Sequence, residues 1–338
     1  MEEVMRTVTR QEQLWAIVLA GGEGGPMGPL VQQWLGRQKP KQYCAFVGTR
    51  SLFQHTLDRT AHLVPPEHIV TVIAREHQEE ACTQFDGRAG MVILQPANRG
   101  TAAEVFLPLT YIRARDPRAT VVMHPSDQFV YPEDRFVEIV QRAVWTAEWL
   151  TDRLALLGVR PDSLDLDYGW IQPGRALAGS DRPYVWEVNA FVEKPSAAQA
   201  QAAMISGALW NTSVLAVKLE TLWKLGWRCF PEMMGLFERL GDQIGTAAEG
   251  RVLEEIYRTM PKRDFSAGLL QRVPDQSAVL ELSGVLWSTW SKPDRVADTL
   301  RQIGKQPAFP MEYVTHGGPM PTNSSATASV EAVSCDAQ

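Results

Sequence analysis

The sequence predicts an α/β fold, in which helices cover both faces of a mostly parallel β-sheet. Short apolar runs alternate with helical segments over the first 150 residues, and this alternation is typical of strands joined by helical crossovers. The runs are hydrophobic throughout, as expected for strands buried on both faces. The predicted strands of this half are residues 15–20, 69–73, 91–94 and 120–123.

Helices are predicted between these strands at residues 51–63, 101–114 and 134–150, and Ser51 is a suitable N-cap for the first. The second half is less regular. Its predicted strands are residues 154–159, 185–192, 214–217, 277–282 and 285–287, with a short strand or turn at 167–171. Four tryptophans at helical spacing are interpreted as core residues rather than a ligand platform: Trp145, Trp149, Trp223 and Trp227.

The predicted organisation is one domain between two extensions. Residues 1–13 form an N-terminal extension, and residues 14–310 form the domain, with two parts (14–150 and 151–310) that share one core. From residue 311 the chain is rich in Gly, Pro, Ser, Thr and Ala, which predicts a disordered tail over 311–338.

Composition limits the function. The 338-residue chain is 45% hydrophobic and 21% charged, with a net charge of −6, so extended nucleic-acid binding is not expected. No apolar run reaches the ~18–20 residues of a membrane span. Residues 1–13 lack the apolar core of a signal peptide. The cysteines are far apart in sequence, which argues against a structural zinc or disulfide framework and fits a reducing compartment: Cys44, Cys82, Cys229 and Cys335. The sequence therefore predicts a cytoplasmic protein with no membrane partner.

The most informative segment follows the first predicted strand, where the chain runs Gly21-Gly22-Glu23-Gly24-Gly25 and then Lys39-Pro40-Lys41-Gln42. Glycines at a strand end expose backbone amides that phosphate can approach closely, and a lysine can neutralise its charge. Asp127 follows the strand at 120–123, so both features belong at the carboxyl edge of the sheet, where such folds bind ligands. This pattern predicts a nucleotide site. His124 has no metal-ligand spacing and is interpreted as a strand-end residue.

The ordered motifs resemble those of the sugar-phosphate nucleotidylyltransferases, and most closely the mannose-1-phosphate guanylyltransferase branch. The resemblance covers roughly residues 14–300 and rests on the segments 19–24, 29–30, 40–42, 95–101, 125–127, 168–171, 191–195, 210–211 and 287–288. It implies a Rossmann-like three-layer α/β/α sandwich with a mixed, mostly parallel sheet, as in nucleotide-diphospho-sugar transferases. It also implies a reaction in which the phosphate of a sugar 1-phosphate attacks the α-phosphorus of a nucleoside triphosphate and pyrophosphate leaves. The expected substrates are GTP and mannose 1-phosphate, and the expected cofactor is Mg²⁺.

Matching the motifs residue by residue assigns expected roles. Lys41 contacts phosphate oxygens and Asp127 binds the metal, so both are the expected catalytic residues. The expected nucleotide-binding residues are Gly21, Gly22, Gly24, Gln95, Asn98, Gly100 and Thr101. The expected sugar-phosphate residues are Tyr168, Gly169, Glu193, Lys194 and Asn211, with Trp170 helping to shape the pocket.

Three positions depart from the family pattern. Pro26 stands where the family has an arginine, Thr289 where it has a second metal-binding aspartate, and Gln128 where a histidine is common. Proline offers neither a cation nor a backbone N–H, and removing a transition-state donor costs on the order of 10²–10³ in rate. The alternative reading is a catalytically impaired relative that binds nucleotide or nucleotide sugar as a regulator or partner subunit. A weaker reading, a glycosyltransferase, depends on Asp165-Leu166-Asp167. A homodimer is the candidate assembly.

Overall fold

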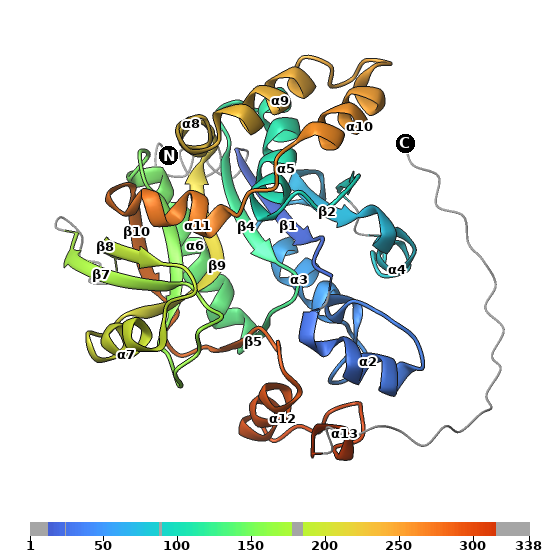
Figure 1. Cartoon of the computed structure of the whole chain (residues 1–338), viewed down its shortest axis with the longest axis vertical. Helices are drawn as coiled ribbons and strands as arrows, with labels where there is room; N and C mark the ends of the chain where they lie inside the picture. Colours follow the sequence, from blue (N-terminus) through green and yellow to red (C-terminus); the bar gives the residue numbers. More distant parts are fainter. Residues whose placement is uncertain (1–12, 24, 88–89, 178–184, 316–338) are drawn as a thin grey trace, which may run out of the picture.

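A computed structural model of the chain describes residues 13–23, 25–87, 90–177 and 185–315, and its centre is a nine-stranded sheet (Figure 1). The strand order is β3-β2-β1-β4-β9-β6-β10-β8-β7. In that order the strands are Met91–Gln95, Ile69–Ala74, Leu14–Ala20, Thr120–Pro125, Leu209–Lys218, Leu154–Val159, Ser277–Glu281, Val185–Val192 and Trp170–Ala176. A second, two-stranded sheet pairs β5 (Phe129–Tyr131) with β11 (Leu286–Ser288).

The first half of the sheet is parallel, as predicted. β1 pairs in parallel with β2 on one side and β4 on the other, and β2 pairs in parallel with β3. The carboxyl ends of these strands therefore meet at one edge. The elements agree closely with the predicted segments, except that β4 continues through His124 to Pro125.

The second half corrects the expectation of a mostly parallel sheet. β9 is antiparallel to both β4 and β6, and β8 is antiparallel to both β10 and β7, so the sheet as a whole is mixed. β6 and β10 form the one parallel pair in this half. β9 is also longer than the predicted 214–217, because it begins at Leu209 and includes Trp210 and Asn211.

Helices cover both faces of the sheet. β1 shows the division: Trp15 and Ile17 point into one apolar cluster, and Ala16 and Val18 into the other. The first cluster contains residues of α5 (Thr101–Arg115), α8 (Leu219–Cys229), α9 (Pro231–Gly241) and α10 (Glu249–Thr259). The second contains residues of α3 (Leu52–Ala61), α4 (Gln78–Cys82), α6 (Glu133–Trp149) and α7 (Ala197–Ile205). Both clusters draw residues from both halves of the chain.

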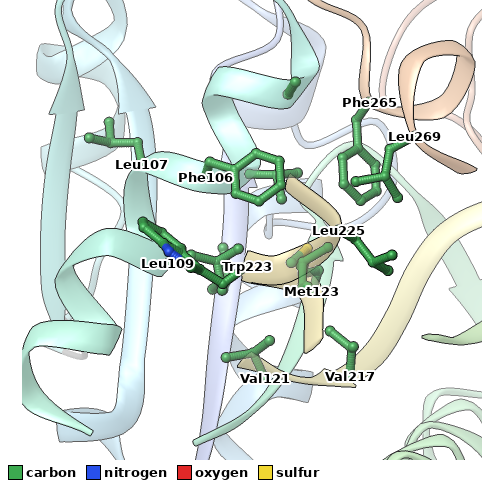
Figure 2. Close-up of a cluster of buried hydrophobic side chains, with 14 of the residues drawn as sticks. Phe106, Leu107, Leu109, Val121, Met123, Val217, Trp223, Leu225, Phe265 and Leu269 are labelled. Carbon is green, nitrogen blue, oxygen red and sulfur yellow. The ribbon is translucent and has the colours of Figure 1, made fainter. Parts of the chain in front are cut away.

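Figure 2 shows part of the first cluster, in which Phe106, Trp223 and Phe265 are labelled. The ring of Phe106 lies 6.4 Å from that of Trp223 on α8, and 6.3 Å from that of Phe265 on α11 (Phe265–Gly268). Met123 of β4 and Val217 of β9 belong to the same cluster. This packing fixes the start of α5 relative to the carboxyl edge of β4.

Two local predictions have different outcomes. The helix that follows Ser51 is confirmed, and Ser51 and Gln54 form a capping box at its start. The interpretation of the four tryptophans is wrong for three of them. Trp223 is buried, whereas the exposed residues include Trp145, Trp149 and Trp227, because α6 and α8 each turn only one face to the sheet.

A third apolar cluster connects the two ends of the described chain. Met27 and Val31 at α2 (Gly28–Leu35) pack with Trp290 and with Val296 and Leu300 of α12 (Pro293–Gln302). This packing brings the segment after β11 back to the segment after β1. The described chain ends with the short helix α13 (Glu312–Thr315), which lies inside the predicted tail. Residues 316–338 and most of the predicted N-terminal extension lie outside the described residues.

Candidate active site

The two predicted catalytic residues meet at the carboxyl edge of the parallel strands. Lys41 Nζ lies 3.0 Å from Asp127 Oδ2 and donates a hydrogen bond of 2.6 Å to the Thr289 carbonyl oxygen. Asp127 reaches this edge because the Ser126 amide donates to the Leu19 carbonyl, which continues the β1–β4 pairing beyond the strand. Lys41 is largely buried, whereas the Asp127 side chain is 38% exposed. The carboxylate therefore remains open to a ligand on one side.

Side chains that follow Lys41 hold the glycine segment in place. Gln42 Nε2 donates to the carbonyl oxygens of Ala20 (3.2 Å) and Gly22 (2.7 Å). The Tyr43 hydroxyl also donates to the Ala20 carbonyl. These bonds use carbonyl groups and occupy no glycine amide, although the Gly21 amide is bonded to Glu104 Oε1 instead. Gly24 lies outside the described residues.

A cavity of about 370 Å³ opens beside Asp127. It collects residues from the ends of several elements: Gly22 after β1, Asp127 after β4, Glu193 and Lys194 after β8, and Ser213 within β9. The pKa of Glu193 is raised to about 7, chiefly by burial and also by Asp264, while Lys194 opposes the shift. One lysine, Lys194, and several carboxylates thus line this cavity, while Lys41 reaches its edge through the ion pair with Asp127.

A second cavity of about 590 Å³ lies next to the first, and Gly22, Thr101, Glu104 and Asp264 line both. Its other lining residues are Gly21, Glu23, Gly25, Gln95, Asn98, Gly100, Lys262 and Arg263. Every described residue that was predicted to bind the nucleotide therefore lines this cavity. Their roles are taken up under the proposed function.

Gly100, in the lining of the larger cavity, leaves no room for a side chain. Its φ is +84°, and a Cβ there would stand 2.2 Å from the Arg263 carbonyl oxygen. That same carbonyl accepts from the Ala102 amide, and the Gly100 amide donates to Asn98 Oδ1 at 2.9 Å. The Asn98 amide group donates to Glu23 Oε1. Both ends of the Asn98 side chain are thus engaged in shaping the loop.

Glu104 was not predicted as a site residue. Its Oε1 accepts from the Gly21 amide at 2.9 Å. Burial raises its pKa to about 7; the Gly21 amide opposes the shift, and the nearby Asp127 adds to it. The available signal in the sequence was a single acidic residue in the otherwise uncharged run 101–112. Asp264 was also missed; it accepts from the Thr101 hydroxyl and caps α11 through the Ala267 amide.

The positions that depart from the family pattern have definite contacts. The Thr289 carbonyl oxygen accepts a hydrogen bond from Lys41 Nζ, and the Thr289 hydroxyl lies 2.8 Å from the Tyr168 hydroxyl. The Gln128 side chain joins the two sheets, because its oxygen accepts from Trp287 Nε1 and its nitrogen donates to the Thr212 carbonyl. Pro26 is exposed in a short 3-10 turn, Gly25–Met27.

The predicted sugar-phosphate residues divide into two groups. Glu193 and Lys194 line the smaller cavity with Asp127. Gly169 lies against Glu193, since a Cβ at Gly169 would be 2.7 Å from Glu193 Oε2. Tyr168 and Asn211 line neither of the two cavities.

These two residues instead support the wall behind the cavities. The main-chain N–H of Asn211 donates to the Gly169 carbonyl oxygen, and the side-chain Oδ1 of Asn211 accepts from the main-chain N–H of Ser213. The Tyr168 ring packs between those of Trp210 and Trp287. Trp170 is buried, with its indole N–H donating to the Asp165 carbonyl.

His124 and the Asp165-Leu166-Asp167 run, the remaining residues singled out in the sequence, have structural rather than ligand-binding contacts. His124 is buried, and burial lowers its pKa to about 3, so it is neutral at physiological pH. In the Asp165-Leu166-Asp167 run, Asp165 Oδ1 accepts from the Asp167 amide, which forms a local turn.

Across the described residues no group of three or more His, Cys, Asp or Glu side chains is arranged to hold a metal ion. No described helix is both long and apolar enough to cross a bilayer.

Comparison with known proteins identifies the family. The family model described as "Nucleotidyl transferase" matches residues 15–248, which include the glycine segment, Lys41 and Asp127. The chain belongs to the nucleotidyl transferase family. The resemblance inferred from the motifs is thereby confirmed.

Individual members of this family are similar over most of the chain. The mannose-1-phosphate guanylyltransferase of Escherichia coli K12 is 28% identical over 295 residues, covering 83% of this chain and 59% of the relative. The xanthan biosynthesis protein XanB of Xanthomonas campestris is 28% identical over 302 residues, covering 86% and 60%. The chain thus spans about three fifths of the length of these curated relatives.

A solved structure extends the comparison to the fold. The Thermus thermophilus protein described as "mannose-1-phosphate geranyltransferase" superposes with a TM-score of 0.72 at 25% identity, covering 87% of this chain and 80% of that one. The overall fold of this chain is therefore similar to that of a solved structure.

Proposed function

We propose that the chain joins GTP to mannose 1-phosphate, releasing pyrophosphate and forming a nucleotide sugar. The single observation that carries this proposal is the ion pair between Lys41 and Asp127, in which Nζ lies 3.0 Å from Oδ2. The pair lies at the edge of the sheet where the glycine segment follows β1. The family match and the similarity to mannose-1-phosphate guanylyltransferases support the choice of reaction and substrates. The three-layer sandwich of nucleotide-diphospho-sugar transferases is the architecture that we infer with it.

The roles of the residues follow from where they lie. The larger cavity takes the nucleoside, with Gln95 and Gly100 as base contacts. Gly22 contacts the triphosphate through its amide, Gly21 permits close approach because it has no side chain, and Thr101 lies at the start of α5, where helix amides favour anions. The resemblance also assigns Gly24 to the nucleotide-binding residues. The smaller cavity takes the sugar 1-phosphate, with Lys194 near its phosphate and Glu193 near its hydroxyls.

Charge neutralisation is the main task at the reacting centre, because both substrates are polyanions. We infer that Lys41 exchanges its bonds to Asp127 and the Thr289 carbonyl for bonds to phosphate oxygens when the substrates bind. Asp127 is a suitable Mg²⁺ ligand: it is a carboxylate with an exposed side, and Mg²⁺ typically takes one or two carboxylates together with substrate phosphates. When bound, the ion supplies Lewis-acid polarisation of phosphoryl oxygens.

A second candidate is an impaired relative that binds nucleotide or nucleotide sugar without turnover. The observation that favours it is Thr289, whose neutral side chain faces Tyr168 at the position of a family carboxylate. Pro26 adds to it, since it brings no cation to the glycine loop. In this reading the chain acts as a regulator or as a partner subunit. A homodimer remains the proposed assembly for either reading, and a cytoplasmic location stays a prediction of the sequence.

One assay separates the two candidates. The protein is mixed with Mg²⁺, GTP and mannose 1-phosphate, and pyrophosphate release is followed beside the Pro26→Arg/Thr289→Asp double variant. We expect the natural chain to turn over. If only the double variant releases pyrophosphate, the enzyme proposal fails for the natural chain. Calorimetry with GTP and GDP-mannose then reports whether the impaired relative still binds them.

A further inference from the structure

We propose that Glu104 selects guanine, by accepting hydrogen bonds from the N1–H and the 2-amino group of the base. This inference rests on the proposed function, because it places the nucleoside in the larger cavity. It assigns the discrimination between bases to a residue on the first turns of α5, outside the sequence motifs that suggested the nucleotide site.

The position of Glu104 carries the first step. Its side chain lines both cavities, so it stands where the nucleoside part of the cleft meets the phosphate part. A Cβ placed on Gly21 would lie 2.5 Å from Glu104 Oε1 and 3.3 Å from Gln95 Oε1. Two side-chain oxygens from different elements therefore converge on one spot in the wall of the nucleoside cavity.

The state of the carboxylate carries the second step. Within the described parts of the chain it receives one hydrogen bond, from the Gly21 amide, and it makes no ion pair. Lys41 is engaged with Asp127 instead. A desolvated carboxylate with a single amide donor is unfavourable, and donors from a ligand would relieve that cost. Its raised pKa has the same cause, which is burial.

The chemistry of the bases carries the third step. Donors from a ligand favour the ionised form of Glu104. In that form each carboxylate oxygen is an acceptor only, so the group accepts from two donors side by side. Guanine presents N1–H and the 2-amino group on adjacent atoms of one edge. Adenine and cytosine each present one amino group beside a ring acceptor, and uracil and thymine present one N–H between two carbonyl groups. Guanine is therefore the common base that satisfies both oxygens of Glu104 at once.

The experiment uses inosine triphosphate, which differs from GTP only by the missing 2-amino group. Calorimetry on the full chain with Mg²⁺ measures the Kd of GTP, ITP and ATP. A hydrogen bond to a charged group predicts that GTP binds about 10–100-fold more tightly than ITP. In Glu104→Gln the GTP-to-ITP ratio is expected to fall to within about threefold, because an amide offers one acceptor and a mismatched donor.

Glu220→Gln is the matched control. It makes the same carboxylate-to-amide change on α8, where Glu220 pairs with Arg113 and lines neither of the two cavities. It should keep the ratio of the natural chain. Thermal melting checks that both variants are folded; if Glu104→Gln does not fold, the ratio measured on the natural chain decides alone.

Each remaining outcome has one reading. Equal affinity of the natural chain for GTP and ITP overturns the proposal, as does an unchanged ratio in Glu104→Gln. A uniform loss of GTP and ITP affinity with a higher Mg²⁺ requirement also overturns it, since it identifies Glu104 as a metal ligand. Selective GTP binding without pyrophosphate release supports the role of Glu104 and removes the enzyme proposal. Pyrophosphate release with equal use of GTP and ITP supports the enzyme proposal and overturns the role of Glu104. Failure to bind either nucleotide overturns both proposals.

Discussion

Lys41 and Asp127 are 86 positions apart in the chain, yet their charged atoms lie 3.0 Å apart. Parallel pairing of β1 with β4 produces this contact, because it brings the segments that follow the two strands to one edge. The pair keeps a lysine and a carboxylate together in the cleft before any ligand is bound. It is the relationship from which the proposed chemistry follows.

Replacing Lys41 by Ala should reduce pyrophosphate release by about 10²–10³-fold, since it removes a preorganised cation from the reacting phosphates. The measurement is kcat/KM with GTP and mannose 1-phosphate. Lys39→Ala is the control, because Lys39 pairs with Glu80 at 2.9 Å and not with Asp127. A Lys41 variant as active as the Lys39 variant would contradict the assigned role.

Asp127→Asn should raise the Mg²⁺ concentration needed for half-maximal activity by at least tenfold, because an amide oxygen is a weaker ligand for this ion than a carboxylate. Titration of pyrophosphate release with Mg²⁺ measures the change. Asp298→Asn serves as the comparison, since Asp298 forms an exposed i,i+3 pair with Arg301 on α12. An unaltered Mg²⁺ titration of the Asp127 variant would show that the ion is held elsewhere.

The contribution of Glu104 to the stability of the ligand-free protein should fall as pH rises from about 5 to about 7.5, while that of His124, whose pKa is lowered, rises over part of this interval. The pKa of Glu104 is about 7 in the fold and close to 4.5 in the unfolded chain, so the folded state holds the proton over this interval and loses its advantage as the group ionises. Glu193 contributes in the same direction, with a pKa of about 7. Melting curves across this range should show a shallower decline in Glu104→Gln than in the natural chain. Parallel curves would indicate that Glu104 is not desolvated.

Gly100→Ala should destabilise the fold by roughly 1–3 kcal/mol and weaken GTP binding, because φ is +84° and the new methyl group would meet the Arg263 carbonyl at 2.2 Å. Chemical denaturation gives the first quantity and calorimetry the second. Gly250→Ala on α10 provides the contrast: no atom lies within 4 Å of its Cβ position, so the change should be neutral or stabilise the helix by up to about 1 kcal/mol. If both variants are equally stable, Gly100 is not required by the backbone.

The parallel half of the fold was predictable because its strands are continuous apolar runs, such as residues 69–73, and the helices between them follow periodic patterns. The antiparallel half was not, since strand direction in a mixed sheet depends on how distant segments pair. Nothing local in the run 214–217 indicates that β9 lies between β4 and β6. The exposure of Trp145 and Trp149 likewise depends on which face of α6 meets the sheet.

The sequence by itself determined the family and most of the residues that line the cleft. These features depend on short segments, such as the glycine run after β1, whose backbone conformation restricts which residues can occupy them. Tertiary structure decided what those residues contact. It engaged Asn98 within its own loop, used Tyr168 and Asn211 to support the wall, and turned Thr289 toward both Lys41 and Tyr168. It also brought Glu104 to the Gly21 amide. The physical reason is that side-chain partnerships form between segments far apart in the chain, and only the packed sheet and helices fix which of them meet.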